Sequence, residues 1–304
     1  MNLNWITFKG MFADSPLWKK VILFIFLLIF CTSFLSGIGL LVTRIADWDG
    51  RSAEAMKVIQ LCSSTGAFIL TPITYIFFTR TDPKGFFQLN LIDPRIIFLG
   101  LLAIITAYPF ISVVGLLNEG MHLPDALQAV EDWMKESEEE AKWLTLLFLD
   151  THTIPGLISN LIVVALVPAI GEELLFRGVI QQSLAQKLKN KHVAVWLAAI
   201  IFSAIHLQFF GFFPRMFLGV LLGYIFLYGK SLIASIFCHF MNNAVVIIYA
   251  YVSDPETALS AESFREMTHG TIAASVLLLC VTAFILMRIK YINDKKENCK
   301  KVAQ

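Results

Sequence analysis

Long apolar stretches dominate this chain and limit it to the folds that a membrane allows. Of its 304 residues, 57% are hydrophobic and only 15% are charged, a composition far from that of a soluble domain. A helix needs about 20 apolar residues to cross a bilayer. Candidate spans are residues 21–42, 58–78, 96–117, 154–181, 193–209, 216–228, 232–251 and 272–289. The sequence therefore predicts an all-α, polytopic bundle of about eight transmembrane helices, the fifth and sixth being the shortest.

The basic residues predict how these helices are oriented. They fall in alternate connections, for example Lys19 and Lys20 before the first span, Lys187 before the fifth, and the tail after the last. An intervening connection, residues 131–140, is acidic. Because cytoplasmic loops are enriched in Lys and Arg, we expect both termini in the cytoplasm. Basic residues on the other side run against this pattern: Arg44, Arg51 and Lys57.

Three polar clusters interrupt the apolar stretches. They are Glu172, Glu173 and Arg177 in GEELLFRG, His206 in FSAIH, and His239 with Asn243 in HFMNN. Ionisable groups are costly at membrane depth and usually mark function. At 1.5 Å per residue, His206 lies about 20 Å and His239 about 12 Å from the basic ends of their helices. We expect Glu172 in a similar band, so the three clusters are predicted to form one site.

The spacing inside the first cluster separates the two glutamates. Glu173 and Arg177 stand at i,i+4 with the acid first, the favourable order for a helical ion pair. Neighbouring side chains on a helix point about 100° apart, which leaves Glu172 free for chemistry; the reverse assignment stays open. Pro168 cannot donate a hydrogen bond to the carbonyl of Val164. A kink or polar opening is therefore expected just before the glutamate pair.

These groups suit the hydrolysis of a peptide bond without a covalent intermediate. A partly desolvated carboxylate is a suitable general base, so Glu172 would deprotonate a water that His206 holds. His239 and Asn243 would donate hydrogen bonds to the oxyanion. Zinc is an alternative, because two histidines and a glutamate are acceptable ligands. The HExxH helix of many zinc proteases is absent, however, as is the GxSxG of serine hydrolases.

Two non-proteolytic interpretations use the same polar cluster. In a transport protein the ionisable groups would relay protons or ions, but the chain shows no internal repeat of the kind that such proteins carry. An immunity or scaffold protein would need no complete set of base, water-holding residue and oxyanion donors. With a formal net charge of +1, the chain has no bulk charge that favours nucleic acid as a partner.

Several other features are interpreted as structural. In residues 124–149, apolar side chains lie near one helix face and acidic side chains lie opposite, which predicts an amphipathic helix at the membrane surface. Gly219 and Gly223 allow two helices to approach closely, and Arg215 is expected to extend to the membrane interface. The five cysteines have no paired spacing and are interpreted as packing residues: Cys31, Cys62, Cys238, Cys280 and Cys299.

The three motifs, in this order, resemble those of the CAAX protease and bacteriocin-processing (CPBP or Abi) family of intramembrane glutamate endopeptidases, which is related to the CAAX prenyl endopeptidases. The resemblance covers residues 157–251, expected to be the catalytic core of a single integral-membrane domain, residues 1–304. It implies Glu172 as base, His206 on the water and His239 with Asn243 as oxyanion hole, while Glu173 and Arg177 orient the others.

The resemblance also implies partners and setting. It implies no metal cofactor, although older family descriptions use the term metalloprotease, which keeps zinc as the alternative. The expected partners are the lipid bilayer and a membrane-associated peptide or protein, either a prenylated CaaX tail or a bacteriocin precursor. The expected location is the plasma membrane of a bacterium.

Overall fold

The computed structural model describes residues 8–80, 82–90, 93–253, 255–256 and 269–302, and its regular elements are all helices. Within these described ranges, seven helices are long and apolar enough to cross a membrane: Leu17–Ile45, Ala53–Thr79, Pro94–Glu119, Ile154–Leu188, Phe212–Gly229, Leu232–Val252 and Gly270–Lys296. The multi-pass, all-helical prediction is confirmed. The fifth candidate, residues 193–209, differs: helix α10 (Lys191–Ala204) has 14 residues, about 21 Å, shorter than a bilayer core of about 30 Å.

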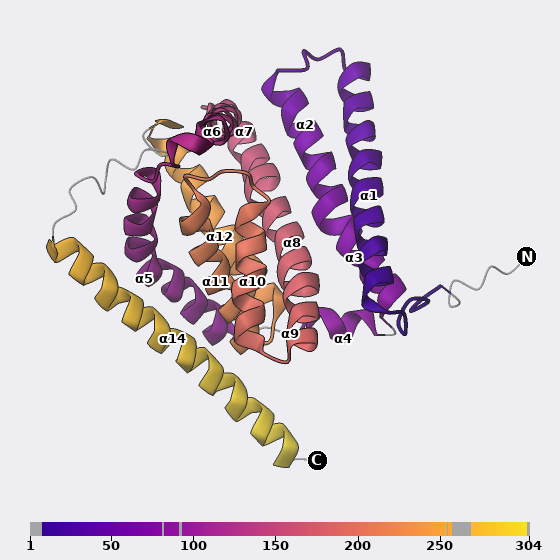
Figure 1. Ribbon diagram of the computed structural model, residues 1–304, viewed down its shortest axis with the longest axis vertical. Coiled ribbons are helices and arrows are strands. Elements are labelled where there is room, and N and C mark those ends of the chain that lie inside the picture. The colour runs from indigo at the N-terminus through magenta and orange to yellow at the C-terminus, as the bar shows by residue number, and fades with distance from the viewer. Residues whose placement is uncertain (1–7, 81, 91–92, 254, 257–268, 303–304) are drawn as a thin grey trace, which may run out of the picture.

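The helices form a central group flanked on two sides (Figure 1). The centre contains α11 (Phe212–Gly229) and α12 (Leu232–Val252), together with α10 and the composite helix that carries α8 (Val167–Glu173). On one side, α1 (Leu17–Ile45) pairs with α2 (Ala53–Ser64) and α3 (Thr71–Thr79). On the other, α14 (His269–Val302) crosses α5 (Pro94–Glu119) obliquely.

The remaining elements connect these groups. The short helix α4 (Pro83–Phe87) follows α3, and α9 (Gln182–Leu188) leads into α10. A 3₁₀ turn, Asp125–Leu127, precedes α6 (Gln128–Leu149), and α7 (Ile154–Asn160) begins the composite helix. Helix α6 is the amphipathic helix expected from the sequence, and it lies across one end of the bundle (Figure 1). Its position at the membrane surface stays a prediction.

Three π-helical segments interrupt the long helices: η2 (Thr65–Leu70), η4 (Leu161–Leu166) and η5 (Leu174–Gln181). The first two lie just before Pro72 and Pro168, the prolines at the starts of α3 and α8. A proline has no N–H to donate to the carbonyl four residues earlier, and at both places the next-turn bond spans five residues instead, as in Val167 N–H to Ile162 O. The helix therefore continues through Pro168 with a π segment before it, and the kink or polar opening expected there stays a prediction.

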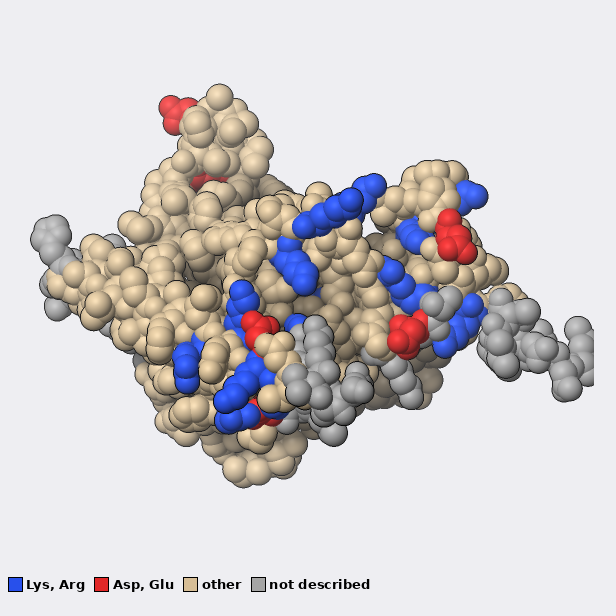
Figure 2. Space-filling view, turned by 90° about the horizontal axis from the view of Figure 1, so that it is seen from below, with Lys and Arg blue, Asp and Glu red and all other residues tan. Residues whose placement is uncertain are grey.

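Buried apolar side chains fill the space between the helices, while their outer faces stay apolar and exposed. One core cluster joins α5, α11, α12 and α14 around Ile225 and Ile289, both fully buried. Of the most apolar part of α1, only 11% is buried. Apolar outer faces are what lipid requires of spanning helices. At the end of the bundle where α9 meets α10, Lys and Arg side chains gather (Figure 2); the orientation of that end in the membrane stays a prediction.

A close helix contact makes Gly66 a sensitive position. A Cβ added there would lie 2.5 Å from the backbone oxygen of Cys31 on α1, so the backbone itself would have to move. We expect Gly66→Ala to lower the free energy of unfolding by about 1–3 kcal/mol, as overpacking does, measured by chemical unfolding in detergent. Gly37→Ala is the matched control, because a Cβ there meets nothing within 4 Å. Equal stability of the two variants would contradict this packing.

Candidate active site

Glu172 and Glu173 end α8, between the π segments η4 and η5. The side chain of Glu173 is fully buried, whereas that of Glu172 keeps 12% of its surface exposed. π segments inside α-helices occur frequently at functional sites. Here the two π segments determine the directions in which the side chains of Glu172 and Glu173 point relative to the neighbouring helices. In an uninterrupted α-helix these directions would be different.

Glu173 is bound by three partners that engage both of its oxygens. Arg177 Nη1 lies 2.8 Å from Oε1, the ion pair that the i,i+4 spacing predicted. His239 Nδ1 donates to the same oxygen at 3.0 Å, and the Ser235 hydroxyl donates to Oε2 at 2.5 Å. Ser235 stands one helical turn before His239 and was not identified from the sequence, although that spacing places both on one helix face. Glu173 therefore holds α8 against α12.

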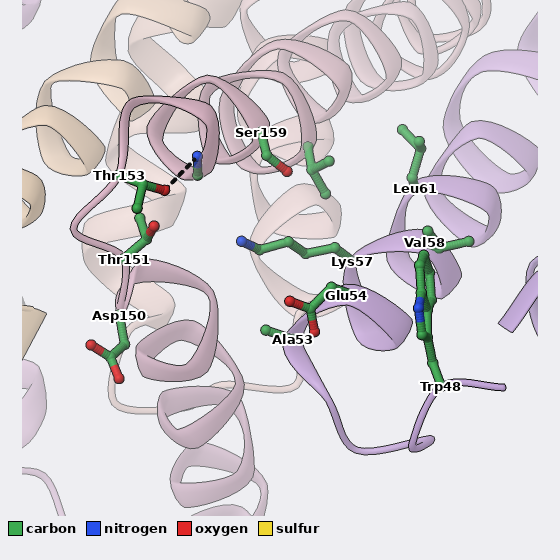
Figure 3. A pocket seen from close by; sticks show the side chains of 12 residues that line it. Trp48, Ala53, Glu54, Lys57, Val58, Leu61, Asp150, Thr151, Thr153 and Ser159 are labelled. Atoms are coloured by element: carbon green, nitrogen blue, oxygen red, sulfur yellow. Dashed lines mark hydrogen bonds between the residues drawn. The ribbon is translucent and has the colours of Figure 1, made fainter. Parts of the chain in front are cut away.

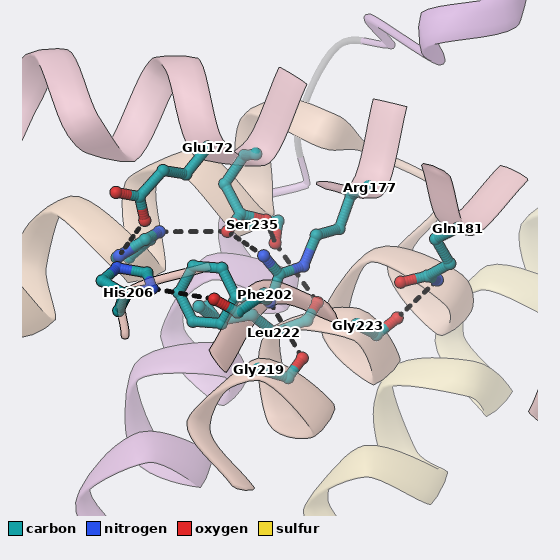
Figure 4. Close-up of polar contacts among 11 residues, drawn as sticks. Glu172, Arg177, Gln181, Phe202, His206, Gly219, Leu222, Gly223 and Ser235 are labelled. Carbon is teal, nitrogen blue, oxygen red and sulfur yellow. Dashed lines mark hydrogen bonds and ion pairs between the residues drawn. The ribbon is translucent and has the colours of Figure 1, made fainter. Parts of the chain in front are cut away.

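Arg177 and Gln181 attach η5 to α11 through the two spaced glycines. Arg177 Nη2 donates to the carbonyl of Gly219 at 2.8 Å, and Gln181 Nε2 donates to that of Gly223 at 3.1 Å (Figure 4). A Cβ on Gly223 would lie 2.9 Å from both Gln181 Oε1 and a methyl group of Val195. The close approach expected for this glycine pair is present. It also exposes backbone carbonyls as acceptors, a role that the sequence interpretation missed.

His239 lies between the two glutamates. With its Nδ1 donating to Glu173, its Nε2 faces Glu172, 3.8 Å from Oε2. The ring is only 3% exposed. Glu172 itself is free of the ion pair that holds Glu173, as the spacing predicted. The two glutamates thus occupy different surroundings: one fully engaged inside the bundle, the other beside an imidazole nitrogen.

His206 lies just beyond a helix rather than on one. Helix α10 ends at Ala204, and the next residue after His206, Leu207, has a left-handed φ of 54°. The expectation of a continuous helix through His206 is therefore wrong. Its Nδ1 still reaches the carbonyl of Phe202 at 2.8 Å. Since a carbonyl only accepts, Nδ1 carries the hydrogen, and Nε2 of the neutral ring has a free lone pair.

The ring of Phe202 is the common wall of this site. It is almost fully buried, and its centroid lies 5.2 Å from that of His206 and 6.1 Å from that of His239. The guanidinium of Arg177 stands 5.1 Å from the same ring. Figure 4 shows these groups around Phe202. The aromatic ring therefore brings residues of η5, the α10 end and α12 to one place and excludes water from between them.

Asn243 lies one turn beyond His239 on α12. Its Oδ1 accepts a hydrogen bond from Asn242 Nδ2 at 3.2 Å. With the oxygen engaged, the amide N–H groups of Asn243 are the side that it offers to an acceptor. The residue is half-buried, as a donor near a substrate path would be.

Arg215 is placed differently from the sequence interpretation, which had it extending to the membrane interface. It is half-buried at the start of α11, donates to Gln208 Oε1 at 2.5 Å and lies within electrostatic range of Glu138 and Glu172. Burial raises the pKa of Glu138 on α6, an effect that the charge of Arg215 opposes. Arg215 stands four residues before Gly219, a spacing that places it on the side of α11 facing the site.

The zinc alternative can be compared with this arrangement. Among the described residues, no group of three His, Cys, Asp or Glu side chains is arranged to hold a metal ion. His239 and His206 both donate through Nδ1, to Glu173 and to the Phe202 carbonyl, so Nε2 is the nitrogen that either ring could offer to a metal. As they stand, Glu172, His206 and His239 do not fit a three-ligand zinc site.

Comparison with known proteins identifies the part of the chain that contains this site. A family model described as type II CAAX prenyl endopeptidase Rce1-like matches residues 154–245. The matched range begins with α7, ends within α12 and includes Glu172, His206, His239 and Asn243. Searches of curated proteins and of solved structures gave no match. Residues 154–245 are thus a domain of the Rce1-like type II CAAX prenyl endopeptidase family.

Proposed function

We propose that this protein hydrolyses a peptide bond of a membrane-associated peptide or protein, with Glu172 activating the attacking water. The family of residues 154–245 implies an intramembrane endopeptidase. The observation that carries the proposed mechanism is the division between the glutamates: three side chains hold Glu173, while Glu172 is partly exposed beside His239. A base must be free to take up and release a proton.

The acceptors suit a single water molecule. Glu172 presents a carboxylate, and His206 presents Nε2 because its Nδ1 is bound to the carbonyl of Phe202. A water that donates one hydrogen to each has its lone pairs directed away from both, toward a scissile carbonyl. Glu172 takes the proton as the oxygen attacks and later delivers it to the leaving amine. No covalent intermediate is needed.

Asn243 and His239 are the proposed hydrogen-bond donors to the oxyanion. Asn243 offers amide N–H groups. His239 donates through Nε2 only when its ring is doubly protonated, because the Nδ1 hydrogen is held by Glu173. Asn243 is therefore the donor that functions in both protonation states of His239, and its loss should be the more direct test of the oxyanion hole.

We expect Asn243→Leu to reduce kcat by about 10²–10³-fold, the usual effect of removing one oxyanion donor, with little change in KM. The measurement is cleavage of a lipid-embedded or prenyl-peptide reporter by protein purified in detergent. Val245→Leu is the control, because it changes an exposed side chain of the same helix. A loss of the same size in both variants would assign the effect to the structure of α12 instead.

The setting of the reaction belongs to the same proposal. We propose one integral-membrane domain, residues 1–304, with residues 157–251 as catalytic core and both termini in the cytoplasm of a bacterium. The acidic helix α6 would then lie on the outer side, over the site. The substrate is a prenylated CaaX tail or a bacteriocin-type precursor, and reporters of both kinds should be compared.

A further inference from the structure

A pocket of about 520 Å³ lies away from the active site, between α2 and the connection from α6 to α7 (Figure 3). Polar side chains line much of it: Glu54, Lys57, Asp150, Thr151, Thr153 and Ser159. Its volume falls in the range of small-ligand sites. We propose that it binds the headgroup of a phospholipid that carries both a phosphate and an ammonium group, such as phosphatidylethanolamine.

The charges in the pocket are opposite but unpaired with one another. Lys57 extends from α2 across the pocket toward the α7 side (Figure 3), with its ammonium 5.8 Å from the centroid of the Phe148 ring. Within the described ranges, neither Glu54 nor Asp150 forms an ion pair with Lys57; Asp150 lies 3.7 Å from His152 instead. The half-buried ammonium of Lys57 and the carboxylate of Glu54 line one pocket without forming an ion pair, which complements a zwitterion better than a simple anion.

The hydroxyl groups complete a phosphate site. Thr153 Oγ1 accepts the N–H of Gly156 at 3.2 Å, which leaves its hydrogen free to donate. Thr151 and Ser159 line the same wall. Together with Lys57 they supply hydrogen-bond donors for phosphate oxygens, while the carboxylate of Glu54 accepts from the ammonium group.

The pocket is polar at one end and apolar at the other, as a lipid is. Glu54 and Thr153 lie at the starts of α2 and α7. Leu61, eight residues further along α2 than Ala53, is about 12 Å deeper. Val58 and Val163 line the pocket with it. Trp48 also lines the pocket, before the first turn of α2, and tryptophan is enriched where helices leave the hydrocarbon core.

This site is separate from the catalytic one. Val163 stands nine residues before Glu172 on the same composite helix, about 13 Å along it, and the lining contains no residue of the candidate active site. The inference therefore does not depend on the proposed peptidase activity. A bound lipid would fill the space between the α1–α3 group and the central helices at this end of the bundle.

Native mass spectrometry of the full chain in detergent tests the proposal, with acyl-matched phosphatidylethanolamine and phosphatidylglycerol offered in equal amounts. We expect preferential retention of phosphatidylethanolamine, reduced about tenfold in Lys57→Met and unchanged in Lys142→Met, a lysine on the exposed side of α6. Glu54→Gln should remove the preference between the two lipids. Circular dichroism of each variant in lipid-free detergent checks that it is folded.

Three outcomes would overturn the proposal. Equal retention by Lys57→Met and Lys142→Met would show that Lys57 binds no headgroup. Phosphatidylglycerol retained as well as or better than phosphatidylethanolamine by the wild type would show that Glu54 binds no ammonium. A higher KM for the peptide reporter in Lys57→Met, with lipid retention unchanged, would assign the pocket to a peptide.

Discussion

Glu172→Gln is expected to remove hydrolysis while the fold stays intact. The substitution keeps the size and shape of the side chain but removes its ability to accept a proton, which costs about 10²–10⁴-fold in kcat for a general base. Glu172 belongs to no ion pair with Arg177, and its Oε2 lies 3.8 Å from Nε2 of His239. Reporter cleavage in detergent measures kcat, and thermal unfolding of the same preparation measures stability.

Glu139→Gln, on the exposed part of α6, is the matched control for loss of a carboxylate. It should retain wild-type kcat. A Glu172→Gln protein that hydrolyses the reporter at a rate close to that of wild type would show that Glu172 is not the base. Glu173 would then be the other carboxylate to consider, the assignment that sequence spacing alone left open.

Arg177→Met is expected to destabilise the protein strongly. Its guanidinium forms an ion pair with Glu173 at 2.8 Å and donates to the Gly219 carbonyl, and both charged side chains are almost fully buried. Removing one partner leaves the other charge buried and uncompensated, which costs about 3–5 kcal/mol in folding free energy. Chemical unfolding in detergent, followed by circular dichroism, measures the change.

The double variant Glu173→Gln/Arg177→Met distinguishes an ion pair from simple packing. Because it removes both charges, it should be less destabilised than the sum of the two single variants. Strict additivity, or a loss below about 1 kcal/mol in Arg177→Met, would contradict the structural role of this pair. Lys142→Met, which removes an exposed charge, should leave stability unchanged.

The sequence predicted those features that depend on residues close together along the chain. The Glu173–Arg177 pair followed from i,i+4 spacing, and the irregular helical hydrogen bonding at Pro168 is a consequence of its missing N–H. The spanning helices were likewise predicted from local sequence, because each is a run of about 20 apolar residues. The family resemblance of the three motifs was confirmed for residues 154–245, while the roles of the individual side chains stay predictions.

The features that were missed depend on contacts between distant segments. Ser235 binds Glu173 across 62 residues of sequence, and Arg215 approaches Glu138 of α6. Apolar periodicity is weak here, because lipid-facing and buried helix faces are both apolar. The periodicity therefore did not predict which face of α11 points toward the site, and that face determines where Arg215 lies. It also did not show that α10 ends before His206.

A proton or ion transporter is the other class of protein in which this polar cluster would function. Proton flux into liposomes should then fall in Glu172→Gln and His206→Ala. The peptidase account predicts no difference between these variants and wild type in that assay. A flux that depends on both residues, together with no reporter cleavage by wild type, would favour transport.

The central claim is that a glutamate, without a metal ion, activates the water. It is tested most directly by reporter cleavage with the purified wild type before and after treatment with a chelator, beside Glu172→Gln. We predict an unchanged rate for the chelator-treated wild type and loss of cleavage in Glu172→Gln. Cleavage that stops with the chelator and returns with zinc would contradict the claim.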